Sequence, residues 1–288
     1  MERLAALDGG RARRPVLGFR RFRQRSQFRP GNAFVASPKA GLIFGPFAAT
    51  EFYLNAGLGF HSNDARGATI TIDPTNIAAP QQRVPLLVRS RGAEVGARTQ
   101  RIKGLDSALA LFILDLDSEL LFVGDAGTTE PSRPSRRIGV EWTNHYQPVP
   151  WVRLDLDLAY TQARFTDYDP VGSYIPGAPT MVGAAGITLG GEAGWFGGLR
   201  WRYFGPRPLI EDGSVWSGPT SLFNARVGYV FENGLKLQLD GFNIFNTQAS
   251  QIDYFYRSQL RNEAAPVNDV HFHPVEPFAL RFTLAKAF

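Results

Sequence analysis

The chain ends with "VEPFALRFTLAKAF", residues 275–288, in which apolar side chains alternate with others. One side of an extended strand would carry five apolar residues: Phe278, Leu280, Phe282, Leu284 and Phe288. The other side would carry Arg281 and Thr283 among small residues. Strict alternation with a period of two predicts a β-strand whose two faces meet different surroundings. The fold therefore depends on what the apolar face contacts.

The same two-faced pattern recurs from about residue 35 onward. It predicts eleven strands, at residues 35–45, 50–61, 86–98, 105–123, 136–146, 151–165, 179–190, 195–205, 220–231, 234–246 and 277–288. Short turns such as "QPVP" (147–150) and "ENG" (232–234) alternate with long connections such as 206–219. Because the alternation never slips, all short turns are expected at one end of the sheet and all long loops at the other.

The predicted strand 105–123 shows how the faces are assigned. Its apolar face would carry Phe112, Leu114, Leu116, Leu120 and Phe122, and its polar face Asp115, Asp117 and Glu119. The polar faces of later strands would add eight charged residues: Glu141, Arg153, Asp155, Asp157, Arg200, Arg202, Arg226 and Arg281.

Two all-β architectures place such strands between unlike surroundings, a soluble β-sandwich and an outer-membrane β-barrel. Strands of this length, rising about 3.3 Å per residue and tilted near 45°, match the roughly 25–30 Å of a bilayer core. The one-sided distribution of short turns and long loops is that of a membrane barrel, as are aromatic residues at strand ends such as Tyr160, Trp195 and Tyr203. The pattern therefore favours an antiparallel transmembrane β-barrel over a sandwich.

Composition narrows the function classes further. The chain has no Cys, which excludes disulfides and thiolate chemistry. Of the net charge of +5, residues 1–29 supply nine Arg against Glu2 and Asp8, so the remainder is slightly acidic and nucleic acid is not an expected partner. Residues 1–34 lack the apolar stretch of a secretion signal. We expect this basic segment to be disordered or spurious and the barrel to occupy residues 35–288.

Several stretches, in this order, resemble the C-terminal half of a TonB-dependent outer-membrane receptor. They are "SPKAGLIFGP" (37–46), "YLNAGLGFHSNDARG" (53–67), "LDSELLFVGDAGTTEPSRPSRRIGVEW" (116–142), "IPGAPTMVGAAGI" (175–187), "RYFGPRPLIED" (202–212), "NARVGYVFENGLKLQLDGFNIFNTQ" (224–248) and the segment from "YFYRSQLRNE" (254–263) to Phe288. The resemblance implies a barrel of about 22 strands, of which this chain would supply eleven, without the plug domain and the TonB-contacting box. It also implies that the chain is a fragment, because eleven strands alone would leave two unpaired edges in lipid.

The resemblance implies a parent protein in the outer membrane of a Gram-negative bacterium. That parent would import a scarce solute with inner-membrane energy, with a ferric siderophore as the first expectation and cobalamin, other chelates and glycans left open. Expected partners are outer-membrane lipid, the metal chelate, the barrel-assembly machinery through the strand ending in Phe288, and TonB only through the part missing here. The missing export signal counts against export of this chain by itself, and without plug and box it is not expected to transport.

Candidate substrate-binding residues are Arg200, Arg202 and Arg226, which could attract an anionic chelate, and His271 and His273 in the last long loop. The two histidines could ligate a metal, but their setting beside Pro274 favours a structural role, so no metal site and no cofactor are expected. No catalytic residues are expected, because neither G-x-S-x-G nor H-E-x-x-H occurs. A passive porin-like or adhesion barrel and, further off, an outer-membrane hydrolase stay open as alternatives.

Overall fold

The structure is a computed structural model. It describes residues 6–8, 11–12, 32–63, 68, 84–123, 128–131 and 133–286. Every element named within these residues is a β-strand. No helix among them is long and apolar enough to cross a membrane.

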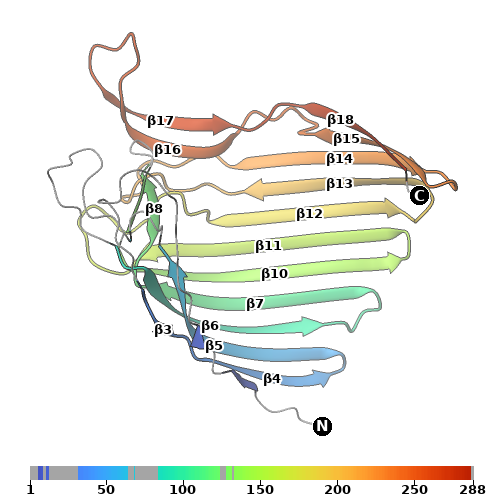
Figure 1. The fold of residues 1–288 in the computed structure, drawn as a ribbon, viewed down its shortest axis with the longest axis horizontal. Coiled ribbons are helices and arrows are strands. Elements are labelled where there is room, and N and C mark those ends of the chain that lie inside the picture. Colours follow the sequence, from blue (N-terminus) through green and yellow to red (C-terminus); the bar gives the residue numbers. More distant parts are fainter. Residues whose placement is uncertain are drawn as a thin grey trace.

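One antiparallel sheet of 12 strands dominates the fold (Figure 1). In sheet order its strands are β1 (Ala6–Asp8), β4 (Lys39–Phe47), β5 (Thr50–Ser62), β6 (Leu87–Thr99), β7 (Leu105–Leu116), β10 (Ser135–Val149), β11 (Val152–Phe165), β12 (Met181–Gly190), β13 (Gly194–Phe204), β14 (Thr220–Val230), β15 (Leu235–Phe242) and β18 (Ala279–Lys286). Three small pairs lie outside it: β2 (Arg11–Ala12) with β3 (Val35–Ala36), β8 (Leu120–Val123) with β9 (Thr128–Pro131), and β16 (Ser250–Ser258) with β17 (Val267–Pro274).

Each of the eleven predicted strands has a counterpart, β4 through β7, β10 through β15 and β18, and their order in the sheet is as predicted. The five short turns lie together at one end of the sheet, and the long connections lie at the other (Figure 1). Beyond the prediction, β1 pairs with β4 at one edge of the sheet, and β18 forms the other edge. Among the described residues no ladder joins these two edges.

The C-terminal strand has the predicted faces. Leu280, Phe282 and Leu284 are 60%, 67% and 62% exposed, and they lie opposite Gly241, Leu239 and Leu237 on the apolar side of β15. Arg281 lies on the other side, opposite Asp240. Large apolar side chains exposed along one face are what a sheet facing lipid requires. Phe288 lies outside the described residues.

The predicted strand 105–123 is wrong beyond Leu116. The chain leaves the sheet there, and β8 pairs with β9 instead. The buried carboxylate of Glu119 accepts hydrogen bonds from the hydroxyl of Ser135 and the guanidinium of Arg137, which anchors the departing chain beside the start of β10. A buried carboxylate is stable only with such hydrogen-bond partners. The chain therefore leaves the sheet after Leu116, where Glu119 can reach Ser135 and Arg137.

The predicted faces of this strand are also wrong. Phe112 lies opposite Glu94 and Gly139, and Leu114 lies opposite Gly92 and Arg137, so both are on the polar face. Leu116, opposite Ser90 and Ser135, lies on the polar face as well. The apolar face instead carries Leu109, Leu111 and Ile113, which are 48%, 55% and 37% exposed. Asp115 lies on that face too, not on the polar one. The side chains of Leu120 and Phe122 are not among those described.

The cause of the error is that "ALALFIL" (108–114) is apolar at both parities, so alternation alone does not select a face. Pairing with β6 and β10 decides it, because directly opposite residues share a face. Where a strand is apolar on both sides, its neighbours determine which side meets lipid.

This register has a direct test in a chain without native Cys. Leu111 and Val140 are directly opposite, so Leu111→Cys with Val140→Cys should form an intramolecular disulfide on mild oxidation. Phe112→Cys with Val140→Cys should not, because those two side chains lie on opposite faces. Gel mobility before and after reduction measures both. The reverse outcome would contradict the faces described for β7.

Candidate functional site

The polar face of the sheet is the part of the molecule that could meet a soluble ligand, and it carries most of the charged residues of the strands. Arg200 and Arg202 on β13 lie on it, opposite Asn224 and Leu222 of β14. Arg226 on β14 lies on it too, opposite Asp240 of β15. The three arginines predicted from the sequence therefore share one face of two neighbouring strands.

Arg226 is paired with an acid of the neighbouring strand. Its Nε donates to the carboxylate of Asp240 at 2.6 Å. The same carboxylate accepts from Arg281 Nη2 at 3.2 Å and from Gln238 Nε2 at 2.8 Å. The side chain of Asp240 is only 5% exposed. Because its partners come from β14, β15 and β18, this one carboxylate links three strands. Of the three predicted arginines, Arg226 therefore has a structural role.

Arg200 and Arg202 differ from Arg226 in having no acidic partner among the described residues. Both are exposed, and within the part of the chain that the structure describes neither side chain has an ion pair or hydrogen bond. Arg153 on β11 is likewise exposed and unpartnered there. Asp155 is the acidic group beside Arg200, across Gly186, but it already bonds Nδ1 of His145 at 2.8 Å. Asp157 lies two strands from Arg202, across Ala184, and no ion pair joins the two side chains.

His271 and His273 lie apart from these arginines, on β17 of the hairpin that extends beyond the long-loop end of the sheet (Figure 1). The two side chains share one side of the strand by alternation, as predicted. The ring of His271 stacks on Tyr256, with centroids 4.0 Å apart and 15° between the planes. No group of three or more metal-ligating side chains occurs within the described ranges. This stacking favours the structural role for His271.

Arg133 joins three long connections at the loop end, which the sequence did not predict. Its guanidinium bonds Asp167 at 2.9 Å, Glu211 at 2.8 Å and the carbonyl of Gly172 at 2.8 Å. It also lies over the ring of Phe165, at 4.5 Å from the centroid. Burial opposes the charge, but hydrogen bonding and the negative charges of Asp167 and Glu211 prevail and raise the pKa of Arg133 above its ordinary value. The segment before β10 and the connections after β11 and β13 are thereby held together.

A second loop contact is a buried ion pair between Arg207 and Asp253. Arg207 Nη2 lies 2.7 Å from the carboxylate, and the two side chains are 10% and 5% exposed. The hydroxyl of Ser217 accepts from both the backbone and the Nε of Arg207. This pair ties the connection between β13 and β14 to β16. Sequence reasoning missed it because the partners are 46 residues apart.

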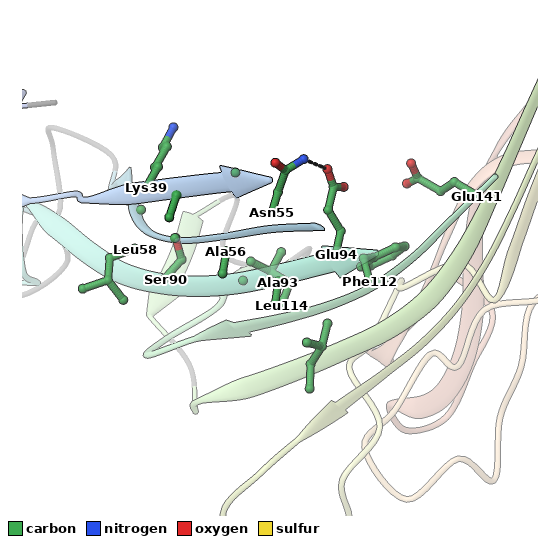
Figure 2. A pocket seen from close by; sticks show the side chains of 16 residues that line it. Lys39, Asn55, Ala56, Leu58, Ser90, Ala93, Glu94, Phe112, Leu114 and Glu141 are labelled. Carbon is green, nitrogen blue, oxygen red and sulfur yellow. Dashed lines mark hydrogen bonds between the residues drawn. The ribbon is translucent and has the colours of Figure 1, made fainter. Parts of the chain in front are cut away.

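The polar face also forms a hollow of about 580 Å³ over β4 to β10. Figure 2 shows Asn55, Glu94 and Glu141 projecting into it from one side of the curved sheet. Nδ2 of Asn55 donates to Glu94 at 2.8 Å, and Phe112 lies beside them. The hollow is lined by two carboxylates, Glu94 and Glu141, and one amine, Lys39. Arg200 and Arg202 have no acidic partner among the described residues, so an anionic ligand would favour the β11–β13 region.

The geometry agrees with a comparison with known families. A family model described as "TonB dependent receptor-like, beta-barrel" matches residues 3–244. The chain belongs to this family. This match confirms the predicted resemblance and the barrel fold. TonB-dependent receptors are transport proteins of the Gram-negative outer membrane. The family match begins at residue 3, inside the segment 1–34. Strand β1 of that segment pairs with β4. The domain boundary at residue 34 stays a prediction.

Solved TonB-dependent receptors share the fold at low sequence identity. The ferric yersiniabactin uptake receptor FyuA from Yersinia pestis is 15% identical with a TM-score of 0.63, and 88% of this chain and 37% of that chain are covered. The ferric-catecholate import receptor Fiu from E. coli K12 is 18% identical with a TM-score of 0.62, over 88% and 35%. The siderophore receptor PiuA from Acinetobacter baumannii is 14% identical with a TM-score of 0.62, over 88% and 36%.

The chain thus spans about a third of the length of these receptors. No curated protein matches it in sequence. The structural likeness shows the fold, and the choice of ligand has to be argued from the residues of this chain.

The role of Asp240 can be tested by its removal. Asp240→Ala leaves Arg226, Arg281 and Gln238 without their common acceptor, and we expect it to lower the free energy of unfolding by about 2–3 kcal/mol. Asp157→Ala is the matched control, since within the described residues Asp157 has no ion pair, and its effect should stay within about 0.5 kcal/mol. Urea unfolding of the chain in a bilayer measures both. Equal effects would show that Asp240 is not a structural centre.

Proposed function

We propose that this chain forms part of the barrel wall of a receptor that imports an anionic metal chelate, with a ferric siderophore as the substrate class. The observation that carries the proposal is that Arg200 and Arg202, on the polar face of β13, have no partner in the part of the chain that the structure describes. On the same face Arg226 and Arg98 are paired with the acids Asp240 and Glu51, whereas Arg153 of β11 shares with Arg200 and Arg202 the lack of a partner within the described residues. Unmatched guanidinium groups are suited to a ligand that brings its own negative charge.

Arginine suits such ligands for a geometric reason. Its planar guanidinium presents several N–H donors in a fixed fork, which pairs with carboxylate and similar oxygen pairs in a bidentate manner. Arg200 and Arg202 are two residues apart on one strand, so their heads can lie about 7 Å from each other along β13. That spacing allows both to contact one multidentate chelate. The chemistry is recognition without reaction, in keeping with a family of transport receptors.

The loop contacts support the same proposal. Arg133 and the pair Arg207–Asp253 hold the connections between β9 and β16 to one another at the long-loop end. A ligand site bounded by loops gains affinity when those loops are already ordered, because less conformational entropy is lost on binding. The names of the similar receptors, which refer to ferric yersiniabactin, ferric catecholates and siderophores, are consistent with this class of substrate.

Binding of iron-loaded chelators to the full chain in a bilayer tests the proposal. Catecholate, hydroxamate and carboxylate chelators are the probes, and Arg200→Ala with Arg202→Ala should weaken binding of the preferred one by about tenfold or more per arginine. The control is Arg101→Ala with Lys103→Ala, which removes the same charge from the exposed turn between β6 and β7. Unchanged binding by the β13 variant would contradict the proposed site.

Energy coupling needs a separate measurement in cells that express the whole receptor. Uptake of the preferred chelate should stop when the inner-membrane energy coupler is deleted. Uptake that persists would instead support a passive pore.

A further inference from the structure

Charged side chains also lie on the apolar face of the sheet, at its long-loop end. Asp115 of β7 lies directly opposite Arg91 of β6 and Arg136 of β10, so the three share one face. Nε of Arg136 donates to one oxygen of Asp115 at 2.6 Å and its Nη2 to the other at 2.9 Å, while Nε of Arg91 donates at 3.0 Å. These residues share their face with Ile113 and Ile138, which are 37% and 52% exposed. The arginine cluster, Arg91 and Arg136 with Asp115, therefore interrupts a surface that otherwise faces lipid.

The cluster lies at one border of the apolar band. On this face of β7, apolar residues run from Leu109 to Ile113, between Ser107 at the turn end and Asp115 at the loop end. Ser107 accepts from Nε1 of Trp142 and donates to Asn144, which marks the other border with polar groups. From Ser107 to Asp115 the strand rises about 26 Å, or roughly 19 Å along the membrane normal at a tilt near 45°. The cluster is thus at the level of the lipid head groups on the long-loop side.

The arginine cluster carries a net positive charge and has N–H donors beyond those that bond Asp115. Arg89 of β6 is two residues from Arg91, on the same face and exposed. Asp117 follows Asp115 opposite Arg89, where its backbone N–H bonds the carbonyl of Arg89, and Arg164 of β11 lies opposite Arg136. Four arginines therefore stand near two carboxylates. The side chains of Arg91 and Arg136 are 70% and 47% exposed, and within the described residues only Asp115 accepts hydrogen bonds from them. Cations on a lipid-facing surface are tolerated only near the interface, where anions can reach them.

We propose that Arg89, Arg91 and Arg136 bind the phosphate groups of an outer-leaflet lipid. Phosphate is the anion that the membrane itself supplies at this depth, and the guanidinium fork matches its oxygens. Asp115 holds Arg91 and Arg136 on either side of β7, so that one phosphorylated head group can reach both. Leu58, opposite Arg91, and Ile138, two residues from Arg136, supply apolar surface for the acyl chains below it. The site is on the face opposite Arg200 and Arg202, so it stands independently of the proposed function.

The test uses the full chain in detergent, with lipid A as the probe and dephosphorylated lipid A as its matched neutral form. Native mass spectrometry counts the retained lipid. The unsubstituted chain should retain lipid A in preference to the neutral form, and Arg91→Ala with Arg136→Ala should lower that retention by about tenfold or more. Arg91→Lys with Arg136→Lys keeps the charge without the fork and should give an intermediate value. Circular dichroism checks that strand content is unchanged in each variant.

The control removes the same charge from the other face, by Arg200→Ala with Arg202→Ala, and should retain lipid A as the unsubstituted chain does. Equal retention of phosphorylated and neutral lipid, or no loss in the Arg91 and Arg136 variant, would overturn the proposal. Displacement of lipid A by an equal concentration of inorganic phosphate would also overturn it, because the site would then be one for a free anion.

Discussion

The fold depends on one constraint, that a backbone in lipid must satisfy all its N–H and C=O groups within the protein. Lateral pairing of neighbouring strands meets this constraint between the two edges of the sheet, with a continuous antiparallel ladder from β4 to β18. Pairing in turn forces side chains to alternate between the two faces. One face can then be apolar and the other polar. Which face a residue lies on decides whether its side chain meets lipid or water.

The polar face separates into charges that are matched and charges that are not. Asp240, at 5% exposure, forms ion pairs with both Arg226 and Arg281 and so ties the last strands together. Arg200 and Arg202 have no such acid within the described residues, and this difference distinguishes a structural arginine from one that can meet a ligand. The acidic hollow around Glu94 and Glu141 shows that the face is not uniformly attractive to anions. The ligand-facing region that we propose, β11–β13, is therefore the part of this face where arginines lack acidic partners among the described residues.

Much of the fold could be predicted from the sequence because the signal is local. The alternation in β18, β13 and β11 showed that these segments are strands and which side of each strand is apolar. The predicted placement of Arg200 and Arg202 on the polar face was confirmed. β7 failed because "ALALFIL" is apolar at both parities, so only its pairing with Glu94 and Val140 selects the face. Arg133, Arg207 and Asp253 could not be predicted, since their contacts join residues 34 to 78 positions apart. Asp240 had a visible signal, as Gln238 and Asp240 alternate with Leu237 and Leu239.

The central claim is that the apolar face of the sheet meets lipid and the polar face meets water. Leu199 and Arg200 are consecutive on β13 and point to opposite faces, so they sample the two surroundings at the same depth. Single variants Leu199→Cys and Arg200→Cys, each labelled with the same fluorophore and placed in a bilayer of brominated lipid, measure the contact. The account predicts strong quenching at position 199 and little at position 200. Equal quenching at both positions, or the reverse order, would contradict it.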